Sequence, residues 1–175
     1  MKKLISLIVC GMCCLGAWAQ GSIPLLDKVQ GHRVTFHYTY SLSKNGGDFS
    51  PVTDGDVVLE GNAYILEGLG LEVVSNGSTR WSLDREAKEL VIETVEKEDL
   101  FTNPALFVGA YKEHMDKMHV NASGAAFLDV TLTLDTDTRA RFLLTDIVYM
   151  APKGKSDFSL DEKSLSGDYV VTDLR

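Results

Sequence analysis

Residues 55–95 read GDVVLEGNAYILEGLGLEVVSNGSTRWSLDREAKELVIETV. Short runs rich in Val, Ile, Leu, Tyr and Trp alternate in this stretch with Gly, Asn and charged breaks, which is typical of consecutive antiparallel strands. The pair Asn76-Gly77 lies between two such runs, 71–75 and 78–83. A type I′ turn needs positive φ angles at both central residues, and Asn-Gly accepts them with little strain. The sequence therefore predicts a two-residue hairpin turn there.

The alternation of apolar and polar residues continues on both sides of this stretch. Between 33 and 42, every second residue is apolar, which predicts a strand with one buried face and one solvated face. Further strands are predicted at 115–121, 126–134, 139–149 and 168–174, and Phe158 with Leu160 is interpreted as a short edge strand. The apolar phase shifts after Thr145-Asp146, which indicates a bulge or a bend.

Two segments have helix-start signals. In 22–29, Ser22 lies near the expected N-cap and Pro24 lies in the first turn. In 103–111, Thr102 or Asn103 can cap, Pro104 suits the first helical position, and nearly every later residue is apolar. A helix that is apolar on all sides is covered on more than one side, so this helix either completes the core or acts as a lid.

These elements define the predicted fold class, which is mainly β with a few short helices. Strands with one apolar face each imply a single antiparallel sheet that curves on itself. That face cannot remain wet, and only the two predicted helices are available to cover it. The sequence thus predicts a half-open barrel whose concave face is covered by short helices.

The first nineteen residues have the features of a secretory signal. Lys2 and Lys3 precede an apolar run, and Ala17 and Ala19 supply small residues before a cleavage site after Ala19. We therefore expect a signal peptide at 1–19 and a single domain at 20–175. All three cysteines (Cys10, Cys13 and Cys14) lie within the signal, so the cleaved protein is expected to contain no disulfide and no thiolate site.

The charge balance and the motifs indicate no enzyme. Seventeen basic and 25 acidic residues give a formal net charge of −8, which disfavours a nucleic-acid partner. The chain has no Gly-x-Ser-x-Gly elbow, no phosphate-binding Gly-rich loop and no His-Glu-x-x-His. Its histidines form two pairs spaced five apart, which on a strand point to opposite faces. We expect no catalytic residues, no metal site and no cofactor.

The order of motifs resembles a known family. A Gly-Asp strand from Gly55 leads to an aromatic at Tyr64, then to Ser-Asn-Gly-Ser-Thr-Arg-Trp at 75–81, and then to Asn103-Pro104 before an apolar segment. This order is similar to that of the periplasmic outer-membrane lipoprotein carriers, the LolA-like proteins, and in particular to their divergent Bacteroidetes-type members. The resemblance covers about 34–175 and also implies a half-open barrel with a lid.

The resemblance implies a carrier in the periplasm that holds the acyl chains of a lipoprotein, or a related lipid, in an apolar cavity. It also implies an inner-membrane donor complex and an outer-membrane acceptor. Seven residues are candidates for the cavity or the lid, with plain core packing as the alternative for each: Phe36, Tyr38, Tyr64, Trp81, Leu106, Phe107 and Tyr111.

The chain departs from the family at one functional position. Many proteobacterial members have an Arg-Pro pair after the Gly-Asp strand, where the arginine is tied to lid closure and cargo release. Gly61-Asn62 occupies the corresponding place here. The competing interpretation is a secreted, non-enzymatic binding or assembly module of the cell envelope that carries no lipid.

Overall fold

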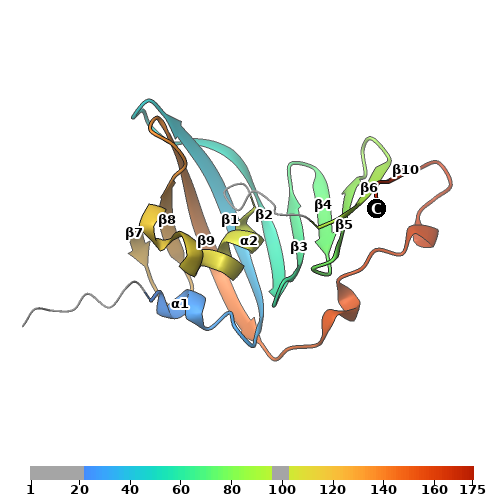
Figure 1. Ribbon diagram of the computed structural model, residues 1–175, viewed down its shortest axis with the longest axis horizontal. Coiled ribbons are helices and arrows are strands. Elements are labelled where there is room, and N and C mark those ends of the chain that lie inside the picture. Colours follow the sequence, from blue (N-terminus) through green and yellow to red (C-terminus); the bar gives the residue numbers. More distant parts are fainter. Residues whose placement is uncertain (1–21, 96–102) are drawn as a thin grey trace, which may run out of the picture.

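The computed structural model describes residues 22–95 and 103–175. The predicted signal peptide and its three cysteines lie outside the described residues. The chain forms one open sheet with the strand order β10-β6-β5-β4-β3-β2-β1-β9-β8-β7 (Figure 1). The strands are β1 (Arg33–Lys44), β2 (Ser50–Glu60), β3 (Ala63–Gly68), β4 (Leu71–Ser75), β5 (Thr79–Asp84), β6 (Glu89–Thr94), β7 (Met118–Ser123), β8 (Leu128–Thr133), β9 (Thr138–Met150) and β10 (Val170–Asp173).

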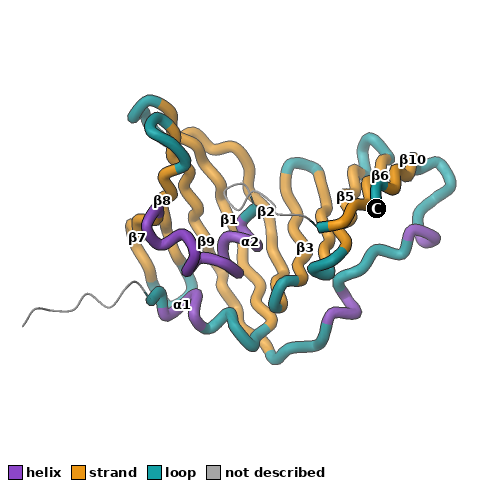
Figure 2. Tube along the Cα trace, in the orientation of Figure 1, coloured by secondary structure: helices purple, strands orange, loops and turns teal. Residues whose placement is uncertain are grey.

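The helical elements are short. They are α1 (Pro24–Asp27), α2 (Pro104–Ala110) and the 3-10 helices η1 (Tyr111–Lys117), η2 (Lys155–Asp157) and η3 (Glu162–Ser164). Figure 2 shows α1 and α2 grouped over the part of the sheet that contains β1, β8 and β9. The prediction of a mainly β fold with a few short helices is confirmed.

The prediction of an all-antiparallel sheet is wrong at one edge. Every other neighbouring pair is antiparallel, but β10 pairs with β6 in parallel, with Val170 opposite Glu89. The reason is the route of the C-terminal segment 151–169, which packs across β3–β6 before the chain joins the far edge. Phe158 and Leu160, expected on an edge strand, belong to this covering segment instead.

The two faces of the sheet are covered by different parts of the chain. Cross-strand partners share a face, and successive residues alternate. We call the side with Val34, Phe36 and Tyr38 the helix face, because α1, α2 and η1 pack on it. The opposite side is the tail face, because segment 151–169 covers it over β3–β6.

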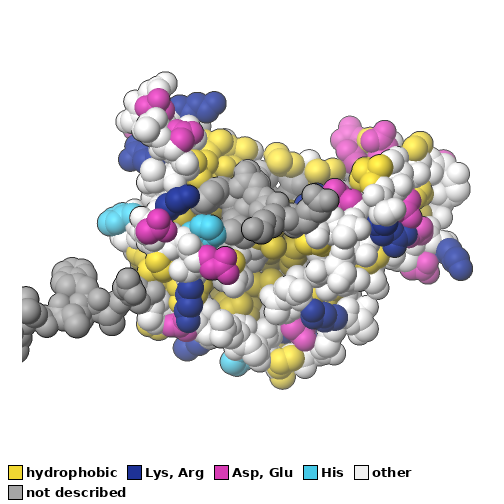
Figure 3. Space-filling model, viewed as in Figure 1, with side chains coloured by type: hydrophobic (Ala, Val, Ile, Leu, Met, Phe, Trp, Pro, Cys, Tyr) yellow, Lys and Arg dark blue, Asp and Glu magenta, His cyan; other side chains and the backbone are white. Residues whose placement is uncertain are grey.

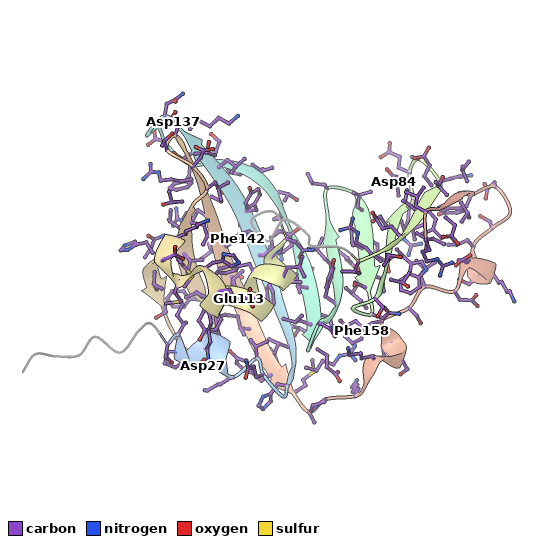
Figure 4. The ribbon with its side chains drawn as sticks, viewed as in Figure 1. Asp27, Asp84, Glu113, Asp137, Phe142 and Phe158 are labelled. Atoms are coloured by element: carbon purple, nitrogen blue, oxygen red, sulfur yellow. The ribbon has the colours of Figure 1, made fainter. Side chains whose placement is uncertain are left out.

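Each face has its own apolar core. On the helix face, buried residues of β1, β2, β8 and β9 pack with Leu26, Phe107 and Tyr111. On the tail face, Trp81 and Phe158 belong to a second core whose sheet residues come from β3–β6. Phe142 and Phe158 accordingly lie in separate regions of the molecule (Figure 4). The sheet therefore buries opposite faces at its two ends.

The predicted hairpin forms, but its turn differs from the predicted type. β4 and β5 pair with Ser75 opposite Arg80, and the backbone N of Asn76 donates to the carbonyl O of Thr79 at 3.2 Å, so the two central turn residues are Gly77 and Ser78 instead of Asn76 and Gly77. Within this turn, Gly77 has a positive φ of 89°, whereas Asn76 and Ser78 do not. Asn76 acts through its side chain, whose Oδ1 accepts hydrogen bonds from the backbone N of Ser78 (2.9 Å) and Thr79 (2.8 Å). The local bonding of an Asx turn replaces the type I′ geometry.

Two further local predictions concern the bulge in β9 and the start of α1. The bulge predicted after Thr145 is confirmed, because the β1–β9 register shifts there and Asp146 has a φ of 54°. Ser22, expected near the N-cap of α1, directly precedes it, and Pro24 lies in the first turn as predicted; the N-cap itself is Ile23, which has no side-chain cap, and the Ser22 hydroxyl bonds to Asp27.

Candidate functional site

The candidate site is the apolar helix face together with α2, the segment that covers it. Asn103 starts α2 as predicted: its Oδ1 accepts hydrogen bonds from the backbone N of Ala105 (3.0 Å) and Leu106 (3.3 Å). Pro104 occupies the first turn, where a missing N–H costs nothing. The cap fixes the point at which the chain turns onto the sheet, so the following apolar residues meet the helix face.

Aromatic stacking joins α2 to the sheet. The ring of Phe107 lies parallel to that of Phe142 on β9, with 5.3 Å between centroids and 9° between planes. Tyr40 on β1 adds a third ring, 5.0 Å from Phe142. Figure 4 shows Phe142 behind α2 in this view. Phe107 and Phe142 are at most 1% exposed, so this aromatic stack fills the space between helix and sheet.

A polar cluster ties α1 to the end of α2. Asp27 Oδ1 accepts from the Tyr111 hydroxyl (2.6 Å) and pairs with Lys112 Nζ (2.6 Å). Hydrogen bonds from Lys112, Ser22 and Tyr111 lower the pKa of Asp27 below its ordinary value. Burial, and then the bond to Asp27, raises the pKa of Tyr111. A cavity of about 250 Å³ is lined by residues of both elements, including all three members of this cluster.

Tyr38 is held at the far end of the helix face. Its hydroxyl donates to the carbonyl O of Glu67 at 3.4 Å. A Cβ at position 68 would lie 2.2 Å from that hydroxyl oxygen, so Gly68 is required for the approach. Burial raises the pKa of Tyr38, which stays neutral and serves as a packing group with one polar contact.

The structure separates the predicted site residues into two groups. Phe36, Tyr38, Tyr64, Phe107 and Tyr111 belong to the helix-face core, and Leu106 packs against it while remaining partly exposed. Trp81 lies on the tail face: the pairing from Trp81 across β4, β3 and β2 leads to Thr35, which alternates with Phe36. Trp81 therefore does not share a cavity with the other candidates.

Some residues of this site were not among the predicted ones. Phe142 and Tyr40 complete the aromatic stack, and both lie in alternating runs that predicted strands. Their apolar periodicity was a usable signal, although it did not separate them from ordinary core residues. Asp27 had no such signal, because its partners Tyr111 and Lys112 are more than 80 positions away.

The apolar part of the helix face ends near β4. On β5 and β6, the same face carries Arg80 and Glu93, joined by an ion pair of 2.8 Å. Trp81 and Ile92, their neighbours in sequence, point to the tail face and are buried there. The candidate site is thus confined to the region of β1–β4, β8 and β9.

The described part of the chain was compared with the requirements of a metal site and of a membrane-spanning helix. Within 22–95 and 103–175, no three or more His, Cys, Asp or Glu side chains are grouped so that they could bind a metal ion. No helix in that part of the chain is long and apolar enough to cross a membrane. Comparison with models of known protein families and with curated proteins found no match for this chain.

Proposed function

We propose that this protein is a non-enzymatic periplasmic carrier that holds the acyl chain of a lipoprotein, or of a related lipid, against the helix face. In this proposal, the open sheet acts as a half-open barrel, and α1 and α2 cover its concave side. The carrier receives cargo from an inner-membrane donor and gives it to an outer-membrane acceptor. No catalytic step is required, because an apolar surface alone can withdraw an acyl chain from water.

One observation carries the proposal: a wide apolar sheet face is covered by very short elements. Among the described residues, α2 and η1 have seven residues each and α1 has four, yet the face extends over six neighbouring strands, from β4 to β8 in the sheet order. Apolar side chains at its margin remain partly exposed: Leu42, Leu66, Val73, Leu106 and Leu134. Figure 3 shows hydrophobic side chains along this side of the molecule, between ends where charged side chains gather. Such a surface suits an elongated apolar ligand.

Magnitudes favour displacement of α2 by cargo. Removing a long acyl chain from water gains on the order of 10 kcal/mol, at roughly 0.8 kcal/mol per CH₂. Losing the packing of one buried aromatic such as Phe107 costs about 3–5 kcal/mol. An acyl chain that takes the place of Phe107 over Phe142 therefore gains more than the loss of that one ring's packing costs, which leaves several kcal/mol to offset the other contacts of α2. In this proposal α2 is the lid, and its own packing fills the cavity when cargo is absent.

The alternative function is an envelope binding or assembly module without lipid cargo. The observation that favours it is the completeness of the aromatic stack, in which Phe107 and Phe142 are almost entirely buried. Under this alternative, α2 is a permanent part of the core. The two functions differ in whether α2 leaves the sheet under native conditions.

Lipid extraction and ligand uptake separate the two functions. We expect an organic extract of the purified protein to contain acyl lipid by mass spectrometry, and the delipidated protein to bind a fluorescent fatty acid. Leu106→Asp, at a partly exposed lid position, should weaken that uptake at least tenfold, because a charge then lies on the acyl path.

Phe127→Asp is the matched control, because Phe127 is 41% exposed in the β7–β8 connection. It should leave uptake unchanged, and circular dichroism should show that both variants keep their β structure. An extract without lipid, together with no uptake by the unmodified protein, would reject the carrier and favour the envelope module.

A further inference from the structure

A groove on the tail face lies over β7, β8 and β9, on the opposite side of the sheet from the candidate lipid site. It encloses about 510 Å³ and is lined by Arg139, Arg141, His119 and Phe49, together with amide and hydroxyl side chains. We call it the arginine groove. None of the residues that line it is Asp or Glu.

Strand register and an aromatic ring hold the two arginines side by side. Arg139 and Arg141 are two apart on β9 and pair with Thr133 and Thr131 on β8, so both point to the tail face. Their guanidinium carbons lie 5.4 Å and 5.9 Å from the ring centroid of Phe49. Cation–π contacts at these distances orient the guanidinium groups without neutralising their charge.

Among the described residues, Arg141 has a carboxylate partner and Arg139 has none. Arg141 binds Asp129 through Nε (2.9 Å to Oδ1) and Nη2 (2.6 Å to Oδ2). Asn121 Nδ2 supports this pair with a 2.9 Å bond to Asp129 Oδ1. Arg139 makes a 3.3 Å hydrogen bond to Ser43 Oγ, and none of the described residues places a carboxylate within 4.0 Å of its guanidinium.

The positive charge of the groove contrasts with the rest of the molecule. The chain carries a net charge of −8. A second groove on the same face, near β2–β4, is lined by Asp54, Asp56, Glu67 and Glu72, with Arg85 as its one cation. In an acidic protein, a groove with an unneutralised arginine and no lining carboxylate attracts anions locally.

We propose that the arginine groove binds an oxyanion, the carboxylate or phosphate group of a small acidic ligand. Arg139 supplies the charge and a planar set of donors that matches two oxyanion oxygens. The hydroxyl of Thr133, opposite Arg139, and the imidazole of His119 provide further polar contacts within the groove. This site is independent of acyl binding on the other face.

Titration with defined anions tests the proposal. The probes are inorganic phosphate, glycerol phosphate and N-acetylaspartate, added at constant ionic strength and followed by NMR of the backbone amides. We expect saturating shifts below about 10 mM for at least one probe, centred on β8 and β9. Preference among the probes identifies the source: a free phosphate, a phosphate ester or a carboxylate.

Arg139→Gln should weaken binding by about tenfold, because it removes a charge-assisted donor pair. Arg85→Gln is the matched control: it removes the same charge from the acidic groove, where Arg85 pairs with Glu72, and should change affinity less than twofold. Arg139→Lys should retain part of the affinity. Equal weakening by Arg139→Gln and Arg85→Gln, or no saturation with any probe, would overturn the proposal.

Discussion

Arg33 connects the start of β1 to the C-terminal segment. Its side chain is about 10% exposed, and Nη1 lies 2.9 Å from Asp157 Oδ2 and 3.9 Å from Glu60 Oε2. Glu60 also accepts hydrogen bonds from the backbone N of Lys153 (3.1 Å) and Gly154 (2.8 Å). One buried arginine therefore joins the sheet to the segment that covers its tail face.

Arg33→Met should lower the free energy of unfolding by about 3 kcal/mol, because it leaves the carboxylate of Glu60 buried without a charge partner. Urea denaturation followed by circular dichroism measures the change. Arg85→Gln is the control, since the Arg85 side chain is 62% exposed and its ion pair contributes little. A loss for Arg33→Met no larger than for this control would show that Arg33 does not anchor the segment.

Asp129 makes stability depend on pH. Its hydrogen bond with Arg141, and then that with Asn121, lowers its pKa from the ordinary value of 3.8. A group whose pKa is lower in the folded state stabilises the fold above its ordinary pKa, and this contribution is lost as pH falls through the folded value. The bonds of Asp129 therefore support the fold at neutral pH and weaken in acid.

Asp129→Asn should be less stable than the unmodified protein at pH 7, by about 1–2 kcal/mol. The difference should shrink as pH falls from about 4 toward 2, because both proteins then carry a neutral side chain at this position. Thermal unfolding across this pH range provides the measurement. A difference that stays constant with pH would assign the loss to packing instead of charge.

At the scale of elements, the C-terminal segment 151–169 acts as the cover of the second core. Phe158 is fully buried against the sheet, where it packs with residues such as Trp81 and Leu83. The guanidinium carbon of Arg33 lies 5.0 Å from the Phe158 ring centroid. Arg33 therefore contacts both this apolar core and the carboxylates of Asp157 and Glu60. Further apolar residues of the segment, Leu160, Leu165 and Tyr169, extend the cover.

Phe158→Ala should destabilise the protein by about 3–5 kcal/mol, through lost burial and the cavity that remains. Phe127→Ala, at an exposed phenylalanine, should change stability by less than about 0.5 kcal/mol. Both values come from urea denaturation under the same conditions. If the two substitutions cost the same, the C-terminal segment would not be part of the folded core.

At the scale of the whole molecule, β1 lies near the centre of the sheet and β10 at one edge, so their backbone amides should differ in protection from hydrogen exchange. β1 pairs along most of its length with β2 on one side and β9 on the other. β10 has four residues, all exposed, and among the described strands it pairs with β6 alone. Opening free energies are lowest where few buried contacts support the backbone hydrogen bonds.

Hydrogen exchange should follow this gradient. We expect amides of β1 and β9 to exchange most slowly, at rates set by global unfolding, and those of β10 to exchange orders of magnitude faster. Mass spectrometry of peptic fragments provides the rates. Equal protection of β10 and β1 would mean that the parallel edge strand is as stable as the sheet centre.

Features set by neighbouring residues were predictable from the sequence. The start of α2 at Asn103 and Pro104 depends on a cap and a ring within one turn, and the bulge at Asp146 depends on a local shift of phase. Most strands followed from alternation, but Phe158 and Leu160 do not form the expected edge strand, and residues 115–117, expected at the start of a strand, belong to η1. The Asn76 turn shows the limit of such local rules. The same residues can form a type I′ turn through the backbone or an Asx turn through the Asn76 side chain, and the structure has the second.

The tertiary structure alone decided which face each strand buries. Alternation has a period of two, so Trp81 and Phe36 give the same pattern although they lie on opposite faces. Which face is buried depends on the segment that covers it, and Phe158, which packs in the same core as Trp81, is 77 positions away in the sequence. Long-range packing also brought Asp27 to Lys112 and aligned Arg139 over Phe49. Sequence periodicity determined the strands, and the burial of apolar area by distant segments determined the sites on them.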